Sequence, residues 1–258
     1  MTFLTDFGSQ SSYPAQMKAI ALNLTNSTLI DITHDIQSHN IREGAFILKT
    51  SAPYFPPGTI HVAVVDPGVG TTRRSIVITT KTQIFVGPDN GLLIPAADQC
   101  NIMHVYEITN EKYFLHPRSA TFDGRDVFTP IAAHILNGTP FEEFGTSITD
   151  YIPLSFGIGK KTGNVIEGEI VYIDRFGNAI TNIEKNVLPD INDKKLLTLK
   201  VSESSINIPF VKTYGQVKLK ELLLTVGSSN FVEISMNQGN AAKKLKLKET
   251  MPVSISIT

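Results

Sequence analysis

The chain has 258 residues, of which 41% are hydrophobic and 18% charged, and its net charge is −1. This length and composition are typical of a folded globular protein and exclude a largely disordered or fibrous chain. The chain lacks the excess of basic residues that nucleic-acid binding requires. Its single cysteine, Cys100, excludes an internal disulfide framework and a Cys-based zinc site.

Residues 1–10 contain no basic segment, and Asp6 interrupts the first apolar residues, so they do not read as a signal peptide. No apolar run reaches the length of about 18 residues that a membrane span needs. We therefore predict a cytoplasmic protein without membrane contact.

The first half of the chain alternates extended and helical patterns. Extended segments are predicted at 2–5, 28–32, 59–65, 84–86 and 104–107. Helices are predicted at 13–24, 41–48 and 126–136, with a short one after Asn90-Gly91. Strands that alternate with helices favour βαβ units, so we predict an α/β domain with a mostly parallel sheet over residues 1–157.

The pattern changes after a stretch at 152–163 that contains proline and glycine. Short alternating runs follow, at 165–173, 196–201, 206–210, 222–226, 231–236 and 252–257. Only 239–245 resembles a helix in this half. We predict a second, mainly β domain over residues 164–258.

Two acidic residues follow predicted strands of the first domain. Asp6 ends the first strand, and ligands gather at the carboxyl ends of strands in α/β sheets, so its carboxylate could bind a ribose diol. A turn or helix-cap role fits Asp6 equally well. Asp66 lies in a glycine-containing turn with Arg73, a pair that could hold and polarise a water molecule or form a structural ion pair.

Two further polar clusters remain ambiguous on local grounds. Residues 119–128 form a strand-to-helix connection in which Asp123 or Asp126 could be the helix N-cap. Residues 173–182 lie between two predicted strands and could be a hairpin that needs glycine and asparagine for positive φ.

Taken together, these clusters carry a resemblance to one family. The matching segments are TDFG at 5–8, HVAVVDPGVGTTRR at 61–74, PDNGLL at 88–93, TFDGRDVF at 121–128, DRFGNAITNI at 174–183 and NQGNAA at 237–242. The chain resembles the S-adenosyl-L-methionine (SAM) hydroxide adenosyltransferases, which are related to fluorinases and chlorinases.

The resemblance implies a doubly wound N-terminal sheet, a mainly antiparallel C-terminal β-barrel and a homotrimer with active sites between subunits. It implies that SAM is the substrate and that neither a cofactor nor a metal takes part. The water-activating residues would be Asp66, Arg73 and the residue at position 123. Substrate-binding roles fall on Asp6, Phe122, Asp174, Asn178, Ser228, Asn237 and Gln238: Asp6 and Phe122 at the ribose, Asp174 and Ser228 at the methionine portion, and the other three at adenine.

The sequence departs from the family motif at Asp123, where relatives have histidine. Two carboxylates beside the single Arg73 would make the site net negative, and we expect a weaker hydrolase for that reason. The predicted reaction is attack of an activated water at C5′ of SAM, which gives adenosine and L-methionine. A non-catalytic SAM or adenosine sensor is the alternative. Halogenation is disfavoured, because Asp66 would repel a halide and Gly124 stands where fluorinases have serine.

Overall fold

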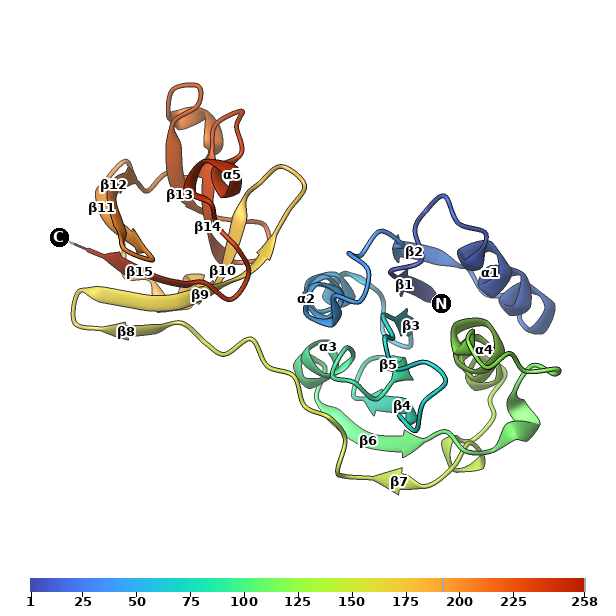
Figure 1. Ribbon diagram of the computed structural model, residues 1–258. Helices are drawn as coiled ribbons and strands as arrows, with labels where there is room; N and C mark the ends of the chain where they lie inside the picture. The colour runs from blue at the N-terminus through green and yellow to red at the C-terminus, as the bar shows by residue number, and fades with distance from the viewer. Residues whose placement is uncertain (192, 258) are drawn as a thin grey trace. The chain divides into compact units, whose positions relative to one another are not determined.

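The chain divides into two units, Met1–Ser155 and Phe156–Thr258, in a computed structural model that describes residues 1–191 and 193–257. The first unit is a sheet with helices on both faces (Figure 1). Its strands are β1 Thr2–Thr5, β2 Ile30–Thr33, β3 Ile60–Val64, β4 Ser75–Thr80, β5 Ile84–Pro88, β6 Ile102–Glu107 and β7 Ser147–Ile148. Its helices are α1 Tyr13–Leu24, α2 Ile41–Ser51, α3 Ile94–Gln99 and α4 Thr129–Leu136, with short helices η1 Ala52–Tyr54, η2 Glu111–Tyr113, η3 Gly124–Phe128 and η4 Phe141–Glu143.

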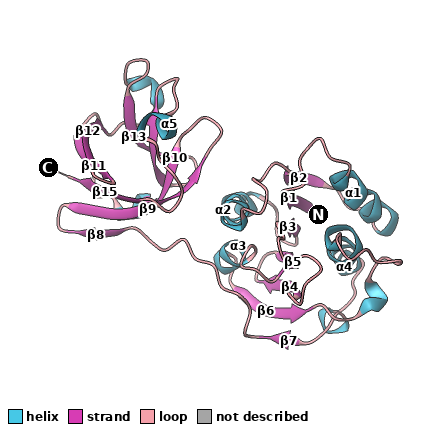
Figure 2. Cartoon of the chain, viewed as in Figure 1, coloured by secondary structure: helices cyan, strands magenta, loops and turns pink. Residues whose placement is uncertain are grey.

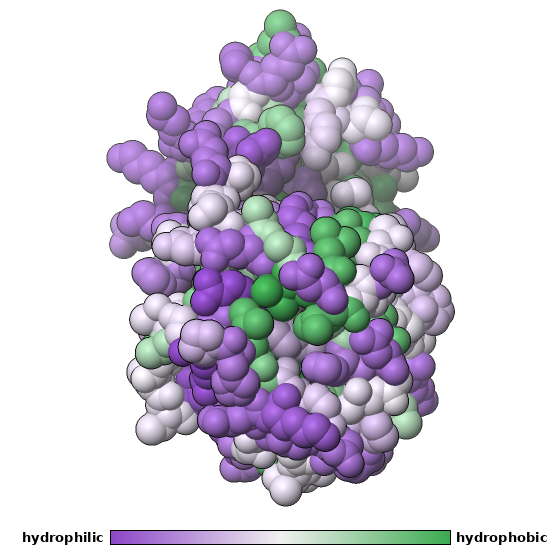
Figure 3. Space-filling view, turned by 90° about the vertical axis from the view of Figure 1, so that its right-hand side faces the viewer, coloured by the Kyte–Doolittle hydropathy of each residue, from purple (hydrophilic) through white to green (hydrophobic). Residues whose placement is uncertain are grey.

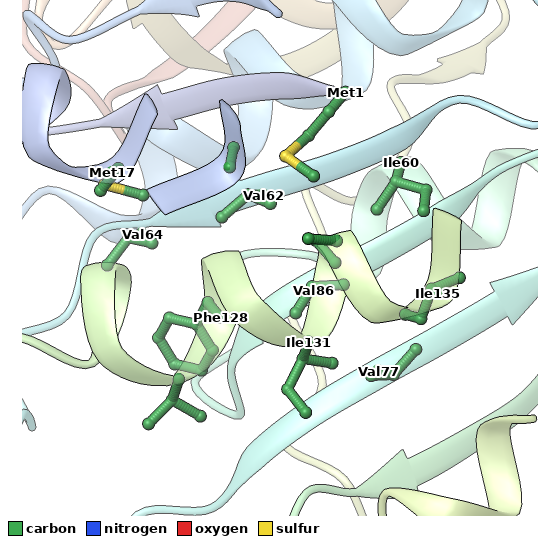
Figure 4. Packing of buried hydrophobic residues seen from close by; sticks show 14 of the residues in the cluster. Met1, Met17, Ile60, Val62, Val64, Val77, Val86, Phe128, Ile131 and Ile135 are labelled. Carbon is green, nitrogen blue, oxygen red and sulfur yellow. The ribbon is translucent and has the colours of Figure 1, made fainter. Parts of the chain in front are cut away.

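The central strands of this sheet are buried on both faces. Val62 and Val64 of β3 belong to the core under α1 and α4, and Figure 4 shows Val62 facing the helix that carries Ile131. The alternate residue Val65 lies against Gly44 of α2, on the opposite face. Because successive strand side chains point to opposite faces, a strand covered on both sides is mostly apolar, and β3 is apolar except for the buried His61.

The sheet has the strand order β2-β1-β3-β5-β4-β6-β7. The pairs β1–β2, β1–β3 and β3–β5 are parallel, whereas β4–β5, β4–β6 and β6–β7 are antiparallel. The sheet is therefore mixed, and the expected predominance of parallel pairs is wrong. The reason is β4, which the sequence reading missed: residues 81–83 connect it to β5, and so short a connection can only join antiparallel strands.

The second unit consists almost entirely of strands (Figure 2). They are β8 Lys160–Thr162, β9 Val165–Ile173, β10 Ala179–Glu184, β11 Leu196–Val201, β12 Ser204–Pro209, β13 Leu222–Val226, β14 Phe231–Met236 and β15 Pro252–Ser256. The helices are α5 Ala241–Leu245, η5 Lys185–Val187 and η6 Tyr214–Gln216.

These strands form one sheet in the order β12-β11-β15-β9-β10-β14-β13, with β8 added beside β9, and all of their pairs are antiparallel. The long strand β9 bends the sheet, because its first half pairs with β15 and its second half with β10. A bridge from Phe210 to Leu224 links the two edges. The result is a nearly closed, barrel-like sheet around an apolar core, as predicted for a mainly β domain.

The surface of α1 is partly apolar, since Tyr13, Leu22 and Leu24 are exposed. Figure 3 views the chain from the side on which Figure 1 draws α1 and α4, and apolar atoms gather near the centre of that face among hydrophilic ones. None of the helices in residues 1–191 and 193–257 combines the length and apolarity that a membrane span requires.

Candidate functional site

Asp6 and Asp66 lie at the same edge of the first sheet. Strands β1 and β3 are parallel neighbours in which Thr5 pairs with Val64, so the residues that follow them leave the sheet side by side. This edge holds the carboxyl ends of the parallel strands, where ligands gather in such folds. The sequence positions alone predicted this placement.

Arg73 reaches back across the turn after β3 to Asp66. Its Nε lies 3.1 and 2.9 Å from the two carboxylate oxygens, and its Nη2 donates to Oδ2 at 2.6 Å. Nη1 donates to Ser75 Oγ at 2.8 Å and to the Arg74 carbonyl at 3.4 Å, and the second bond of Nη2 goes to Asp123 Oδ2 at 2.6 Å. Every N–H group of this guanidinium therefore has an acceptor.

The turn that carries Arg73 depends on Gly70. This residue has φ +77°, and a Cβ atom there would lie 2.8 Å from the carbonyl oxygen of Ala120. Only glycine adopts that backbone conformation without strain and leaves room for the neighbouring chain. The close approach brings the turn after β3 against the segment that leads to Asp123.

Asp123 is held between two arginines and occupies the N-cap position of η3. Its Oδ2 accepts from Arg73, and its Oδ1 accepts from Nε and Nη2 of Arg118 at 3.2 and 2.9 Å. The side chain makes no capping hydrogen bond to η3, which begins at the next residue. Asp126 instead accepts from the backbone of Ser119 and pairs with Arg125.

The four side chains alternate in charge along the row Asp66, Arg73, Asp123, Arg118. The expectation of a net negative site is wrong, because it counted one arginine and the structure brings two. Both carboxylates are buried, at 5% and 3% exposure, and Arg73 is 11% exposed. Burial alone would lower the pKa of Arg73, but its hydrogen bonds and charge interactions with Asp66 and Asp123 outweigh that effect and raise it.

The sequence reading missed Arg118. A basic residue five positions before Asp123 was visible, but it lies outside the TFDGRDVF motif that drew attention to this segment. Its guanidinium lies over the ring of Phe114, with 5.3 Å between the guanidinium carbon and the ring centroid. Asp123 and Arg118 line a cleft of about 570 Å³ in the first unit. Solvent can therefore approach the buried row through this cleft.

An aromatic cluster stands beside the Asp6 turn. Phe7, Tyr13 and Phe122 pack edge to face, with ring centroids 5.1 to 5.9 Å apart. A Cβ atom on Gly124 would lie 3.4 Å from the Phe7 ring. The side chain of Asp6 accepts a hydrogen bond from the backbone of His39 at 2.8 Å. The segments of Asp6 and Phe122 are thus neighbours, as a shared ribose-binding role requires.

In the second unit, Asp174 organises the turn between β9 and β10. Its Oδ1 accepts from the backbone N–H groups of Phe176 and Asn178, each at 2.9 Å, and its Oδ2 accepts from the Asn178 side chain at 2.9 Å. Gly177 in this turn has φ +83°. The hairpin interpretation of residues 173–182 therefore describes the structure, and the turn leaves Phe176 exposed at its tip.

The segment that contains Asn237 and Gln238 lies beside this turn. The carbonyl of Gly177 accepts from the backbone of Ala242, and the α-carbon of Gly177 lies against the side chain of Asn240. The Asn237 side chain donates to the Val217 carbonyl at 2.8 Å. Gln238 has φ +49°, and its carbonyl accepts from the Lys220 ammonium.

Ser228 lies in the turn between β13 and β14, next to Gly227, whose α-carbon contacts the Glu233 carboxylate. Glu233 is a residue that the sequence reading missed. It accepts from the Tyr214 hydroxyl at 2.8 Å, and burial together with the charge of Asp174 raises its pKa. In the second unit, the predicted polar residues therefore lie in the β9–β10 turn, the β13–β14 turn and the segment after β14.

The cluster in the first unit can perform acid–base chemistry, because it places two buried carboxylates on one guanidinium beside a cleft. Within residues 1–191 and 193–257, no group of three His, Cys, Asp or Glu side chains could hold a metal ion.

Comparison with known proteins gives consistent matches over both units. Residues 1–145 match the SAM hydroxide adenosyltransferase N-terminal domain, and residues 168–254 match the C-terminal domain of that family. A protein of Methanocaldococcus jannaschii named (R)-S-adenosyl-L-methionine hydrolase is 36% identical, with 96% of this chain and 92% of the relative covered. A protein of the same name from Salinispora tropica is 34% identical over 95% and 93%. A crystal structure of an uncharacterized conserved protein from Thermotoga maritima superposes with a TM-score of 0.94 at 34% identity, covering 99% of each chain.

Proposed function

The chain belongs to the SAM hydroxide adenosyltransferase family, and we propose that it hydrolyses SAM to adenosine and L-methionine. The observation that carries the proposal is the buried Asp66–Arg73–Asp123 cluster at the carboxyl edge of the parallel strands. Such a cluster offers carboxylate oxygens to a water molecule at the place where an α/β sheet binds its ligand.

In the proposed reaction, the water oxygen forms a bond to C5′ of the ribose while the bond from C5′ to the sulfonium sulfur breaks. The sulfur keeps the bonding electron pair and leaves as the neutral thioether of methionine. One proton of the water must leave, since the product is an alcohol. Water has a pKa of about 15.7 in bulk, but its O–H groups become strongly acidic as the oxygen forms the bond to carbon. A carboxylate is then a sufficient base.

The hydrogen bonds assign different roles within the cluster. Each N–H of Arg73 is already engaged, so the water would be bound by the remaining lone pairs of Asp66 and Asp123. Arg73 would fix both carboxylates and act on the water through its charge. Holding the water in line with C5′ can contribute on the order of 7 to 11 kcal/mol. The proton would leave to solvent through the cleft that Asp123 lines.

We propose that the substrate is bound as the family resemblance implies, with no cofactor. Asp6 would accept hydrogen bonds from the ribose hydroxyls beside Phe122. Asp174 and Ser228 would face the methionine portion. Asn178, Asn237 and Gln238 would meet adenine, and the ordered Asp174–Asn178 turn supports that role because it orients both side chains.

We also propose a cytoplasmic homotrimer and displacement by an SN2 path. The relatives from Methanocaldococcus jannaschii and Salinispora tropica are named (R)-S-adenosyl-L-methionine hydrolase, and we propose the same preference for (R)-SAM for this chain. Sedimentation of the purified protein tests the trimer, and a stable monomer with full activity would contradict it.

Incubation with SAM, followed by chromatography of adenosine and methionine, tests the hydrolysis. Asp66→Asn keeps the shape of the side chain but removes the base, so turnover should fall about 10²- to 10⁴-fold while SAM still binds. Asp31→Asn, at a surface ion pair, is the matched control and should keep full turnover. A wild-type protein that binds SAM and leaves it intact would be the sensor of the alternative interpretation.

A further inference from the structure

Arg118 supplies most of the hydrogen bonding that Asp123 receives. It contributes two donors to Oδ1, at 3.2 and 2.9 Å, whereas Arg73 contributes one donor to Oδ2. Arg73 divides its charge between two carboxylates and directs Nε and one N–H of Nη2 to Asp66. A single guanidinium therefore cannot neutralise both carboxylates, and the second positive charge comes from Arg118.

The two arginines differ in accessibility. Arg73 is 11% exposed, whereas Arg118 is 38% exposed and reaches Asp123 from the wall of the cleft. Its guanidinium also lies over the Phe114 ring, so its position does not depend on Asp123 alone. The carboxylate of Asp123 is buried, and a buried carboxylate stays ionised only if it is paired.

We propose that Arg118 is a positioning residue of this site, which keeps Asp123 ionised and directs Oδ2 to Arg73, so that a carboxylate can work at this position. The proposal rests on the proposed function for its catalytic consequence. Its structural part, an Asp123 kept ionised by Arg118, stands on the contacts alone.

Other charged groups near Asp123 do not replace Arg118. Arg74 lines the same cleft but is paired with Asp89 and Asp150. Glu107 and Glu111, also in the cleft wall, are acidic and would oppose ionisation of Asp123.

On the η3 side, Arg125 donates to Asp126 and to Gln16. Removal of Arg118 therefore leaves Asp123 with one arginine, Arg73, whose Nη2 also donates to Asp66.

The first test is the pH dependence of adenosine release by wild type, Arg118→Met and Arg118→Lys. Methionine keeps an unbranched apolar side chain and removes the charge, so the acidic limb of the profile should move to higher pH by on the order of one unit. The rate on that limb should fall about tenfold for each unit. Lysine restores a point charge and should return the limb toward the wild-type position.

The same change in an Asp123→Asn background separates positioning from folding. Asp123→Asn/Arg118→Met has no titratable group at 123, so any acidic limb that it keeps should coincide with that of Asp123→Asn. Lys81→Met, which removes one exposed positive charge from the β4–β5 turn, should leave the wild-type profile unchanged. Equal shifts from Arg118→Met in both backgrounds, or no shift in the native one, would overturn the proposal.

A carboxyl-carbon NMR titration makes the result independent of hydrolysis. The Asp123 signal is assigned by its loss in Asp123→Asn, and its pKa should be higher in Arg118→Met than in wild type. An unchanged Asp123 pKa would overturn the proposal even in an active enzyme. If wild type releases no adenosine but the Asp123 pKa is higher in Arg118→Met than in wild type, the proposed hydrolysis is contradicted and the role of Arg118 toward Asp123 is supported.

Discussion

Removal of Arg73 should strongly destabilise the first unit, because Arg73 lies between two buried carboxylates. Arg73→Met keeps an unbranched stem next to Phe128 but leaves Asp66 and Asp123 without the guanidinium between them. Breaking one partner out of a buried ion pair costs about 3 to 5 kcal/mol, whereas an exposed pair contributes about 0 to 1 kcal/mol. The exposures of 11%, 5% and 3% place this cluster in the buried class. We expect a loss of about 3 kcal/mol or more in the free energy of unfolding.

The pH dependence of this loss follows from Asp66. Without Arg73 its buried carboxylate has a folded-state pKa above the unfolded value of about 3.9. A group with a raised folded pKa contributes stability at low pH, and that contribution is lost as pH rises through the folded pKa. The deficit of Arg73→Met should therefore be larger at about pH 8 than at about pH 5.

Urea unfolding followed by far-UV circular dichroism measures both effects, since the chain has no tryptophan for fluorescence. The control is Lys18→Met at the Lys18–Asp31 pair, whose side chains are 33% and 39% exposed. It should change stability by less than about 1 kcal/mol. If Arg73→Met costs no more than Lys18→Met, or costs the same at both pH values, the description of a buried charged cluster is refuted.

Three further predictions concern other parts of the first unit. Asp6→Ala should weaken adenosine binding at least tenfold, from the loss of charge-assisted hydrogen bonds of about 1.5 to 3 kcal/mol, and unchanged affinity in calorimetry would contradict the ribose role. Gly70→Ala should lower the melting temperature more than Gly138→Ala. Both glycines have positive φ, but only at Gly70 would a Cβ atom contact the backbone, 2.8 Å from the carbonyl oxygen of Ala120. Equal melting temperatures of the two variants would contradict this prediction. Burial lowers the pKa of His61 to about 4. The free energy of unfolding should therefore decrease by about 3 kcal/mol as pH falls from about 6.5, the unfolded pKa, to about 4. Urea titrations of His61→Gln should not show this decrease.

The sequence predicted the fold well where one strand or helix had a clear pattern. The predicted strand at 2–5 and helix at 13–24 are β1 and α1. It failed at β4, Ser75–Thr80, which directly follows the arginine-rich turn and for which no strand is predicted. Without β4, the turn at 81–83 could not be recognised as a hairpin, and the sheet was taken as mostly parallel.

An ion pair of the site could be predicted when both of its residues lie in one sequence motif, and could not be predicted when only one of them does. Asp66 and Arg73 lie seven residues apart in one motif, and the structure brings them into contact. Arg118 lies outside any motif, and its pairing with Asp123 depends on the path of the loop that precedes η3. Charge counted from motif residues alone therefore gave a net negative site, whereas the charges of Asp66, Arg73, Asp123 and Arg118 sum to zero.

The most direct test of the proposed hydrolysis is the fate of the water oxygen. Purified protein is incubated with SAM in water enriched in heavy oxygen, and the adenosine is analysed by mass spectrometry alongside the amount of methionine. We expect one heavy oxygen at the 5′ position of each adenosine and an equal amount of methionine, with about 10²- to 10⁴-fold less of both from Asp66→Asn in the same time. Recovery of intact SAM, or of adenosine without the label, would contradict attack by an activated water in this site.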